Sequence, residues 1–130
     1  MDLFSLVTDI KLENQGTWVP YGDATFLVAR SGNKKYNRRM ADAYKTNRVV
    51  LELEDDSSDA MSEEIFSDVI ANAILLGWKG VSWKGSSLDY SVENAKMVLL
   101  ASRDFRNIIA RMSDDIENYR VKAEVEQGNA

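Results

Sequence analysis

The chain has 130 residues, of which 45% are hydrophobic and 28% are charged, and its formal net charge is −5 at pH 7. This composition is typical of a globular protein, and the length suits one domain. Because the sequence contains neither cysteine nor histidine, it excludes disulfides, thiolate nucleophiles and Cys-type zinc sites, and it lacks the commonest general base and metal ligand. We therefore expect a protein that is not an enzyme and that uses no cofactor or metal.

Two further features bear on location and partners. Residues 1–12 lack the basic start and long apolar core of a signal peptide, and no apolar run approaches the roughly 20 residues that span a bilayer. These patterns predict a cytoplasmic protein. The net negative charge also argues against a general nucleic-acid binder.

Residues 1–32 are predicted to form a β element, either a hairpin or a small antiparallel sheet. Alternating side chains predict a first strand with one face formed by Leu6, Thr8, Ile10 and Leu12. Asn14–Gly16 supply turn chemistry. A return strand then runs to Arg30 with a break near Pro20, because proline cannot donate to a strand ladder. Since a lone hairpin is marginally stable, we expect it to pack on the helices or on another subunit.

About four helices are predicted to follow. Asn33 is a candidate N-cap for the first, over residues 33–48, and Val49–Leu53 fit either an extension of that helix or a short strand. The second helix is expected to begin after Ser58 or Asp59. It should be the most buried helix of the protein, because it carries an apolar stripe formed by Met61, Ile65, Val69 and Ala73.

A corner over Gly77–Asn94 separates these helices from the last two. Gly77 should end the second helix in a left-handed conformation, and Ser91 should cap the third helix. The corner is too apolar for a solvated linker, so we expect it to dock on the flanking helices through Trp78, Val81, Trp83, Leu88 and Tyr90. Ser102 marks a break before the last helix, whose apolar positions run from Phe105 to Tyr119.

Together these elements predict a single α+β domain over residues 1–130 that is mostly α-helical. It consists of the β element over 1–32, a helical part over 33–125 and a polar tail over 121–130 that should fray.

Charges of opposite sign are segregated along the chain. The first predicted helix is basic on the face that carries Lys34, Lys35, Arg38 and Arg39. The segment that follows is acidic and contains Asp55, Asp56 and Asp59. This separation predicts head-to-tail contacts between copies of the chain. The basic face also leaves open a small DNA-binding regulator.

Motifs that would indicate a ligand site do not match. The glycines at 77, 80 and 85 fit neither the dinucleotide-binding nor the P-loop spacing. The acidic run 52–59 lacks the glycine and the distant glutamate of a helix-loop-helix calcium loop. These segments are therefore interpreted as turns and a solvated, helix-capping loop.

Several segments, taken in their order along the chain, resemble those of a known family. They are the hairpin over 9–30, the run Ala29–Tyr36, the segment Gly77–Val81 with the Gly85 turn, the segment Leu88–Ala95, the pair Leu99–Leu100, and the closing helix with Phe105, Ile109 and Tyr119. This arrangement, which covers nearly the whole chain, resembles the tail assembly chaperones of long-tailed, siphovirus-type bacteriophages.

The resemblance implies a non-enzymatic function in the host bacterial cytoplasm. Such chaperones bind and solubilise the helical tape-measure protein, help to recruit the major tail protein as the tail tube assembles, and are absent from the mature virion. In many relatives a programmed translational frameshift adds a second domain to some copies, and the polar end Glu126–Ala130 is compatible with such a junction.

A chaperone for a long amphipathic helix needs apolar or aromatic grooves. The candidate protein-binding residues are Trp18, Tyr21, Trp78 and Trp83. The candidate self-association residues of a homo-oligomer are Lys34, Lys35, Arg38, Arg39, Asp55, Asp56 and Asp59. Two other functions stay open, namely a structural protein of the tail or head–tail junction, and a DNA-binding regulator that uses helix 33–48.

Overall fold

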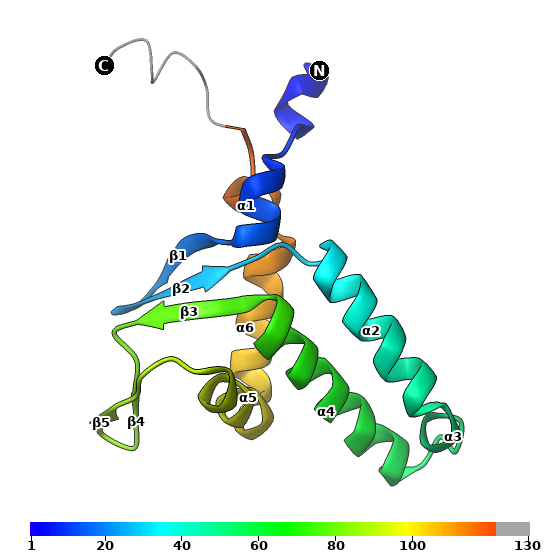
Figure 1. The fold of residues 1–130 in the computed structure, drawn as a ribbon. Helices are drawn as coiled ribbons and strands as arrows, with labels where there is room; N and C mark the ends of the chain where they lie inside the picture. Colours follow the sequence, from blue (N-terminus) through cyan, green and yellow to red (C-terminus); the bar gives the residue numbers. More distant parts are fainter. Residues whose placement is uncertain (122–130) are drawn as a thin grey trace.

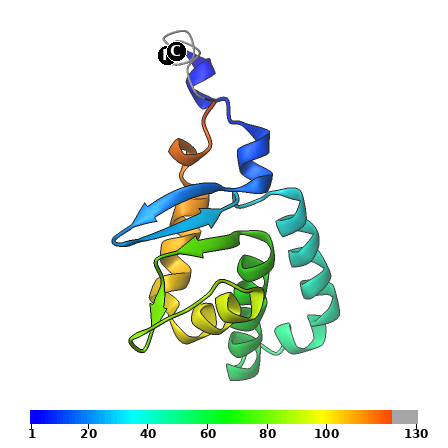
Figure 2. The ribbon, with the colours of Figure 1, turned by 60° about the vertical axis from the view of Figure 1, so that its left-hand side comes forward.

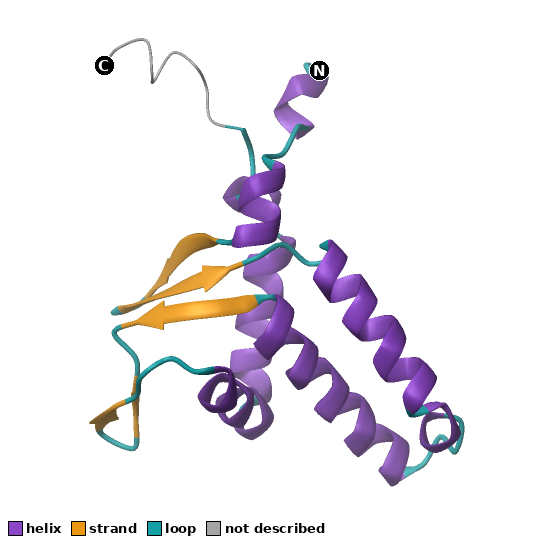
Figure 3. Cartoon of the chain, viewed as in Figure 1, coloured by secondary structure: helices purple, strands orange, loops and turns teal. Residues whose placement is uncertain are grey.

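The computed structural model describes residues 1–121, and its fold is α+β and mostly helical, as the sequence predicts (Figure 3). The helices are α1 (Ile10–Gln15), α2 (Lys34–Thr46), α3 (Arg48–Leu51), α4 (Asp56–Ala73), α5 (Val92–Ala101) and α6 (Arg103–Asp114). Short 3₁₀ helices span Leu3–Leu6 and Ile116–Asn118. The strands are β1 (Thr17–Tyr21), β2 (Ala24–Val28), β3 (Leu75–Lys79), β4 (Ser82–Trp83) and β5 (Ser86–Ser87).

The arrangement has a small sheet with helices extending from it. Strands β1, β2 and β3 form an antiparallel sheet in that order, and α6 crosses one of its faces (Figure 1). Helices α2 and α4 run side by side in opposite directions away from the sheet, and α3 joins them at the far tip (Figures 1 and 2). Strands β4 and β5 form a separate two-stranded hairpin.

The sequence-based prediction of the first strand was wrong. Residues Leu3–Leu6 and Ile10–Gln15 form short helices, because Asp2 and Asp9 accept hydrogen bonds from the backbone N–H groups two residues later and thereby cap them. Within residues 1–121, the alternating segment pairs with another part of the chain only at the isolated antiparallel bridge between Thr8 and Arg120. Gly16 follows a helix, and the hairpin turn lies at Gly22 and Asp23 instead.

A small antiparallel sheet in this part of the chain is confirmed, but the expected return strand is two strands, β1 and β2, and its break lies at the Gly22–Asp23 turn rather than at Pro20. Pro20 lies in β1, which is an edge strand, so its missing N–H costs no ladder hydrogen bond. The third strand was not predicted and interrupts the expected helical part. Gly77 does not end a helix: α4 stops at Ala73, and Gly77 pairs with Leu27 inside β3. Short apolar runs such as 73–78 fit a helix and a buried strand equally well. Pairing with β2 therefore decides that most of this run forms a strand.

The core is centred on α4, which is the most buried helix, as predicted. One cluster joins α4 to the sheet and to α5 and α6 and includes Phe26, Val28, Ile70, Ile74, Leu75, Trp78, Leu99 and Ile109. A second cluster fills the space between α2 and α4 with Ile65, Val69 and Ala73, against which Tyr36, Met40 and Leu51 pack. Helix α4 therefore packs against the sheet, α5 and α6 through one cluster and against α2 through the other.

Most predicted helix boundaries are confirmed. The side chains of Asn33, Ser91 and Ser102 each accept a hydrogen bond from the backbone N–H three residues later and start α2, α5 and α6. Helix α4 begins earlier than predicted, because Asp55 accepts from Ser57 and Ser58.

The structure also decides the state of Val49–Leu53 and the position at which the last helix ends. Val49–Leu53, left undecided by the sequence, contributes mainly to helix α3. The last helix ends at Asp114 rather than near Tyr119, because Asp115 caps a 3₁₀ turn. The predicted fraying of 121–130 and the proposed frameshift junction fall, apart from Val121, outside the described residues.

Candidate functional site

The predicted corner over 77–94 is a packed structure held by two aromatic side chains. The indole N–H of Trp78 donates to the carbonyl of Leu88 at 2.8 Å, and the rings of Trp78 and Tyr90 meet edge to face with centroids 5.3 Å apart. The Tyr90 hydroxyl donates to the carbonyl of Leu75 at 2.7 Å. Burial, and secondarily the negative charge of Glu93, raises the pKa of Tyr90, which keeps this hydroxyl protonated as a donor.

The pleat of the sheet separates the four aromatic residues predicted to contact a partner. Phe26 pairs with Trp78 and the next residue, Leu27, pairs with Trp18. Because consecutive residues of a strand point to opposite faces, Trp78 lies on the inner face and Trp18 on the outer face. Trp78 is only 7% exposed. It therefore belongs to the core and not to the surface that a partner would meet.

Trp18 is an exposed aromatic side chain on the outer face of the sheet. It is 45% exposed, and the ammonium of Lys79 lies 4.3 Å from its ring centroid. The edge of the indole also lies over Gly77, where a Cβ would stand 3.5 Å away, an ordinary van der Waals distance. Trp18 therefore lies against β3 on the outer face, beside Lys79.

Tyr21 and Trp83 lie apart from Trp18. Tyr21 is exposed and follows Val19 on the opposite face of β1, where both line a hollow beside Ile108 and Met112 of α6. Trp83 is half-buried in the small β4–β5 hairpin. The structure therefore does not gather the four predicted aromatics into one surface.

A groove that the sequence did not indicate lies between α2, α4 and α6. Its volume is about 360 Å³, and its lining comprises Met40, Tyr44, Ser62, Glu63, Ile65, Phe66, Arg103, Arg106 and Asn107. Met40, Ile65 and Phe66 pack in the two core clusters and also line this groove, so the groove marks the seam between the clusters. Sequence periodicity could not locate this seam, because it depends on how the three helices cross.

Charged side chains form the rim of this groove. The guanidinium of Arg106 is almost fully buried and donates to the carbonyl of Leu99 at 2.7 Å at the end of α5. Its other terminal nitrogen lies 3.6 Å from the Glu63 carboxylate. An apolar floor with paired charges at its edge is the surface chemistry that accepts an amphipathic helix.

The predicted self-association residues lie at opposite ends of the pair of helices α2 and α4. Lys34, Lys35 and Arg38 lie in the first turns of α2 near the sheet, whereas Asp55, Asp56 and Asp59 lie at the start of α4 near the far tip (Figure 1). Arg39 is engaged within the chain, since its Nε donates to Asp68 of α4 at 2.8 Å. The antiparallel helices thus separate the two signs in space as well as in sequence.

A second feature missed by the sequence reasoning is the N-terminal arm, defined here as Met1–Val7. The arm projects away from the sheet and helices (Figures 1 and 2). Its base is fixed where the Asp9 N–H donates to the Tyr119 carbonyl at 2.7 Å and the Val121 N–H donates to the Val7 carbonyl at 3.3 Å. All of its residues are exposed, and five of them are large and apolar, namely Met1, Leu3, Phe4, Leu6 and Val7.

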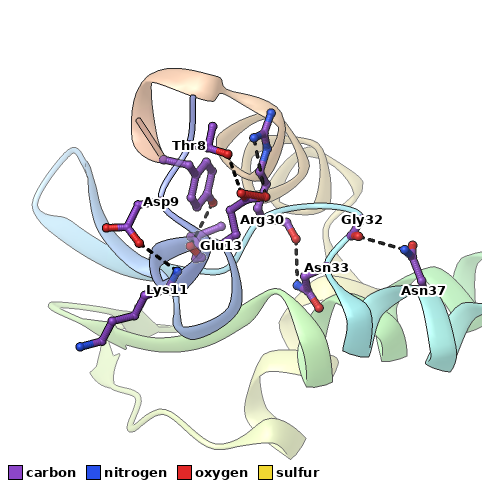
Figure 4. Close-up of polar contacts among 10 residues, drawn as sticks. Thr8, Asp9, Lys11, Glu13, Arg30, Gly32, Asn33 and Asn37 are labelled. Carbon is purple, nitrogen blue, oxygen red and sulfur yellow. Dashed lines mark hydrogen bonds and ion pairs between the residues drawn. The ribbon is translucent and has the colours of Figure 1, made fainter. Parts of the chain in front are cut away.

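A polar network ties the base of the arm to the rest of the fold (Figure 4). The Thr8 hydroxyl donates to Glu13 at 2.6 Å, and Glu13 in turn lies 3.8 Å from the Arg30 guanidinium. Arg30 also lies over the ring of the fully buried Tyr119, whose pKa is raised by burial. The arm therefore starts from a rigid base.

Neither a cluster of metal ligands nor a membrane-spanning helix is found among the residues that the structure describes. Within residues 1–121, no group of three or more carboxylates is arranged to hold a metal ion. Across the same residues, no helix is long and apolar enough to cross a membrane.

These observations define a small α+β protein with an open helix-lined groove and an apolar projecting arm. A family model described as YdaY prophage protein matches residues 29–129, and the chain belongs to this family. It is thus a protein of phage origin. The match includes α2–α6 and omits the arm, α1, β1 and β2. Comparison with curated proteins and with solved structures finds no match.

Proposed function

We propose that this protein is a non-enzymatic assembly chaperone for the phage tail, which binds and solubilises the tape-measure protein in the host cytoplasm and promotes assembly of the tail tube with the major tail protein. The observation that carries the proposal is the groove between α2, α4 and α6, with its apolar floor and charged rim. Phage origin and the resemblance of the sequence to tail assembly chaperones supply the biological context.

The groove suits a helical ligand for physical reasons. A tape-measure protein is a long helical chain, and the apolar stripe of an amphipathic helix is covered most simply by laying it in an apolar groove. Tyr44 stands half-exposed at the edge of the floor formed by Ile65 and Phe66. A single groove of this size gives weak binding, so several copies along one helix would act together.

The test is co-expression with the tape-measure protein encoded by the same phage genome, followed by affinity capture of this chain. We expect the tape-measure protein to become soluble and to co-purify. Tyr44→Asp should reduce the captured amount at least about tenfold, because it places a charge against the apolar floor. The matched control is Tyr21→Asp, which changes an equally exposed tyrosine far from the groove and should leave capture unchanged.

The outcomes separate the alternatives. If Trp18→Ala abolishes capture while Tyr44→Asp has no effect, the outer face of the sheet binds the partner through Trp18, one of the four contact residues that the sequence suggested. If the tape-measure protein stays insoluble and unbound with the unaltered chain, the proposal fails. Presence of this chain in purified virions would favour a structural protein of the tail or head–tail junction instead.

A further inference from the structure

The N-terminal arm presents an unusually apolar surface for an isolated chain. Including Ile10 of α1, the large apolar side chains in this region are each between 44% and 94% exposed, and they are Met1, Leu3, Phe4, Leu6, Val7 and Ile10. Scattered exposed apolar residues need no explanation, but a contiguous set of this size marks an interaction surface.

The geometry of the arm makes it amphipathic. In a 3₁₀ helix, side chains three residues apart are eclipsed, so Leu3 and Leu6 share one edge. Asp2 and Ser5 share another, where the Ser5 hydroxyl donates to the Asp2 carbonyl at 2.8 Å. Phe4 lies on the third edge. Two of the three edges are therefore apolar, and the polar edge is occupied by capping interactions.

The rest of the described chain does not cover this surface. No residue of the arm belongs to either core cluster of residues 1–121, and the arm points away from the groove (Figure 1). The nine following residues, 122–130, contain a single large apolar side chain, Val125. Their composition does not match a surface with six large apolar groups.

We propose that the arm together with Ile10 is covered by the same surface of a second copy of this chain, in a two-fold symmetric dimer. A two-fold interface brings one patch against itself, which an apolar surface tolerates without any requirement for complementary charges. Each partner contributes roughly 800 Å² to a standard interface, so we expect the contact to cover all six side chains together.

Charge also favours a second copy at this surface. The chain carries a net charge of −5, so most contacts between two copies meet like-charge repulsion. Asp2 and Asp9 are the only charged side chains among residues 1–10, and both carboxylates accept backbone hydrogen bonds as caps. The arm is therefore a part of the surface with few charges, where burial of the apolar side chains can outweigh the repulsion between the two carboxylates of each copy.

The test is the mass of the full-length chain by sedimentation equilibrium and light scattering at 1–100 µM. We expect a dimer, and the double variant Phe4→Asp/Leu6→Asp should weaken it at least about 100-fold because two buried apolar side chains become charged. The matched control is Val49→Asp/Leu53→Asp, which alters two residues that are 78% and 58% exposed at the far tip of the molecule. The control should keep the dimer.

Folding and salt dependence complete the test. Thermal melts by circular dichroism should be the same for both variants, since none of the four residues is in the core. Raising salt from 50 to 500 mM should leave the dimer intact, because an apolar contact is not screened. A monomeric unaltered chain, a dimer unaffected by Phe4→Asp/Leu6→Asp, or dissociation by salt would each overturn the inference.

The tape-measure protein is the alternative occupant of the arm. If the chain alone is a monomer and Phe4→Asp/Leu6→Asp abolishes capture of that protein, the arm binds the tape-measure protein, and the dimer is wrong. The proposed function is tested separately by Tyr44→Asp, so failure of one proposal is distinguishable from failure of the other.

Discussion

Asp68 shows at the scale of one residue how α4 is tied to its neighbours. Its carboxylate accepts from Arg39 of α2 at 2.8 Å and lies 3.5 Å from the ammonium of Lys96 of α5. Burial by itself would raise the pKa of Asp68, but the two cations outweigh it and hold the pKa below the usual value of 3.8. One partly buried carboxylate thus connects three helices.

Replacing this carboxylate should make stability depend less on pH. Because the pKa is lowered in the folded state, the charged form stabilises the fold above about pH 4, and this contribution is lost as the pH falls through the lowered value. We expect Asp68→Asn to reduce the free energy of unfolding by about 1 kcal/mol at pH 7. Urea unfolding should show the difference shrinking toward pH 3.

A suitable control for this variant is Asp42→Asn. Asp42 is exposed on α2 and forms no ion pair among residues 1–121, so its replacement should have little effect at any pH. Equal losses of stability for the two variants, or a difference that grows as the pH falls, would contradict the assigned role of Asp68.

At the scale of secondary-structure elements, Asn33 joins the beginning of one helix to the end of another. Its side-chain oxygen accepts from the Tyr36 N–H at 2.9 Å and starts α2. Its amide nitrogen donates to the carbonyl of Arg30 at 2.8 Å and to the carbonyl of Ala73, the last residue of α4, at 3.0 Å. The side chain is 9% exposed, so water cannot readily replace these partners.

This double function predicts an unusual result for an ordinary capping substitution. Aspartate and asparagine are equally good N-caps in general, yet Asn33→Asp removes both donated hydrogen bonds and brings a charge beside two carbonyls. We expect Asn33→Asp to lose about 1–3 kcal/mol of unfolding free energy. Chemical denaturation measures this loss. At Ser91, whose side chain is used as an acceptor, Ser91→Asp should cost less, and equal costs at both caps would refute the reasoning.

At the scale of the whole molecule, the antiparallel pair α2 and α4 carries unlike charges at its two ends. Lys34, Lys35 and Arg38 make no ion pair within residues 1–121. A basic end and an acidic end on one molecule favour head-to-tail contacts, which extend an assembly rather than close it after two copies. We propose that such contacts link dimers formed by the arm.

Charge reversal at one end should therefore remove only the salt-sensitive part of self-association. We expect Lys34→Glu/Lys35→Glu to abolish species larger than the dimer at 50 mM salt, where surface charges are weakly screened, and to leave the dimer itself. Lys45→Glu/Lys84→Glu changes the net charge equally at other positions and is the control. Light scattering gives the mass, and large species that persist in the first variant would argue against this contact.

Local chemistry in the sequence was sufficient for much of the fold. The polar caps at Asn33, Ser91 and Ser102 and the apolar stripe of α4 predicted α2, α4, α5 and the start of α6, because caps and helical periodicity depend on residues close in the chain. The edge position of Pro20 followed from its missing donor. The absence of histidine and cysteine likewise limited, from composition alone, the chemistry available to the protein.

Tertiary structure decided the features that depend on residues far apart in the chain. The chain leaves the helix after Ala73 because β2 offers a strand to pair with, which places Trp78 in the core and Trp18 on the opposite face. The groove exists because α2, α4 and α6 cross without filling the space between them. The alternating pattern over residues 6–12 resembles a strand, but within residues 1–121 it pairs only through the isolated Thr8–Arg120 bridge, so local capping by Asp2 and Asp9 prevails and the apolar side chains of the arm stay exposed.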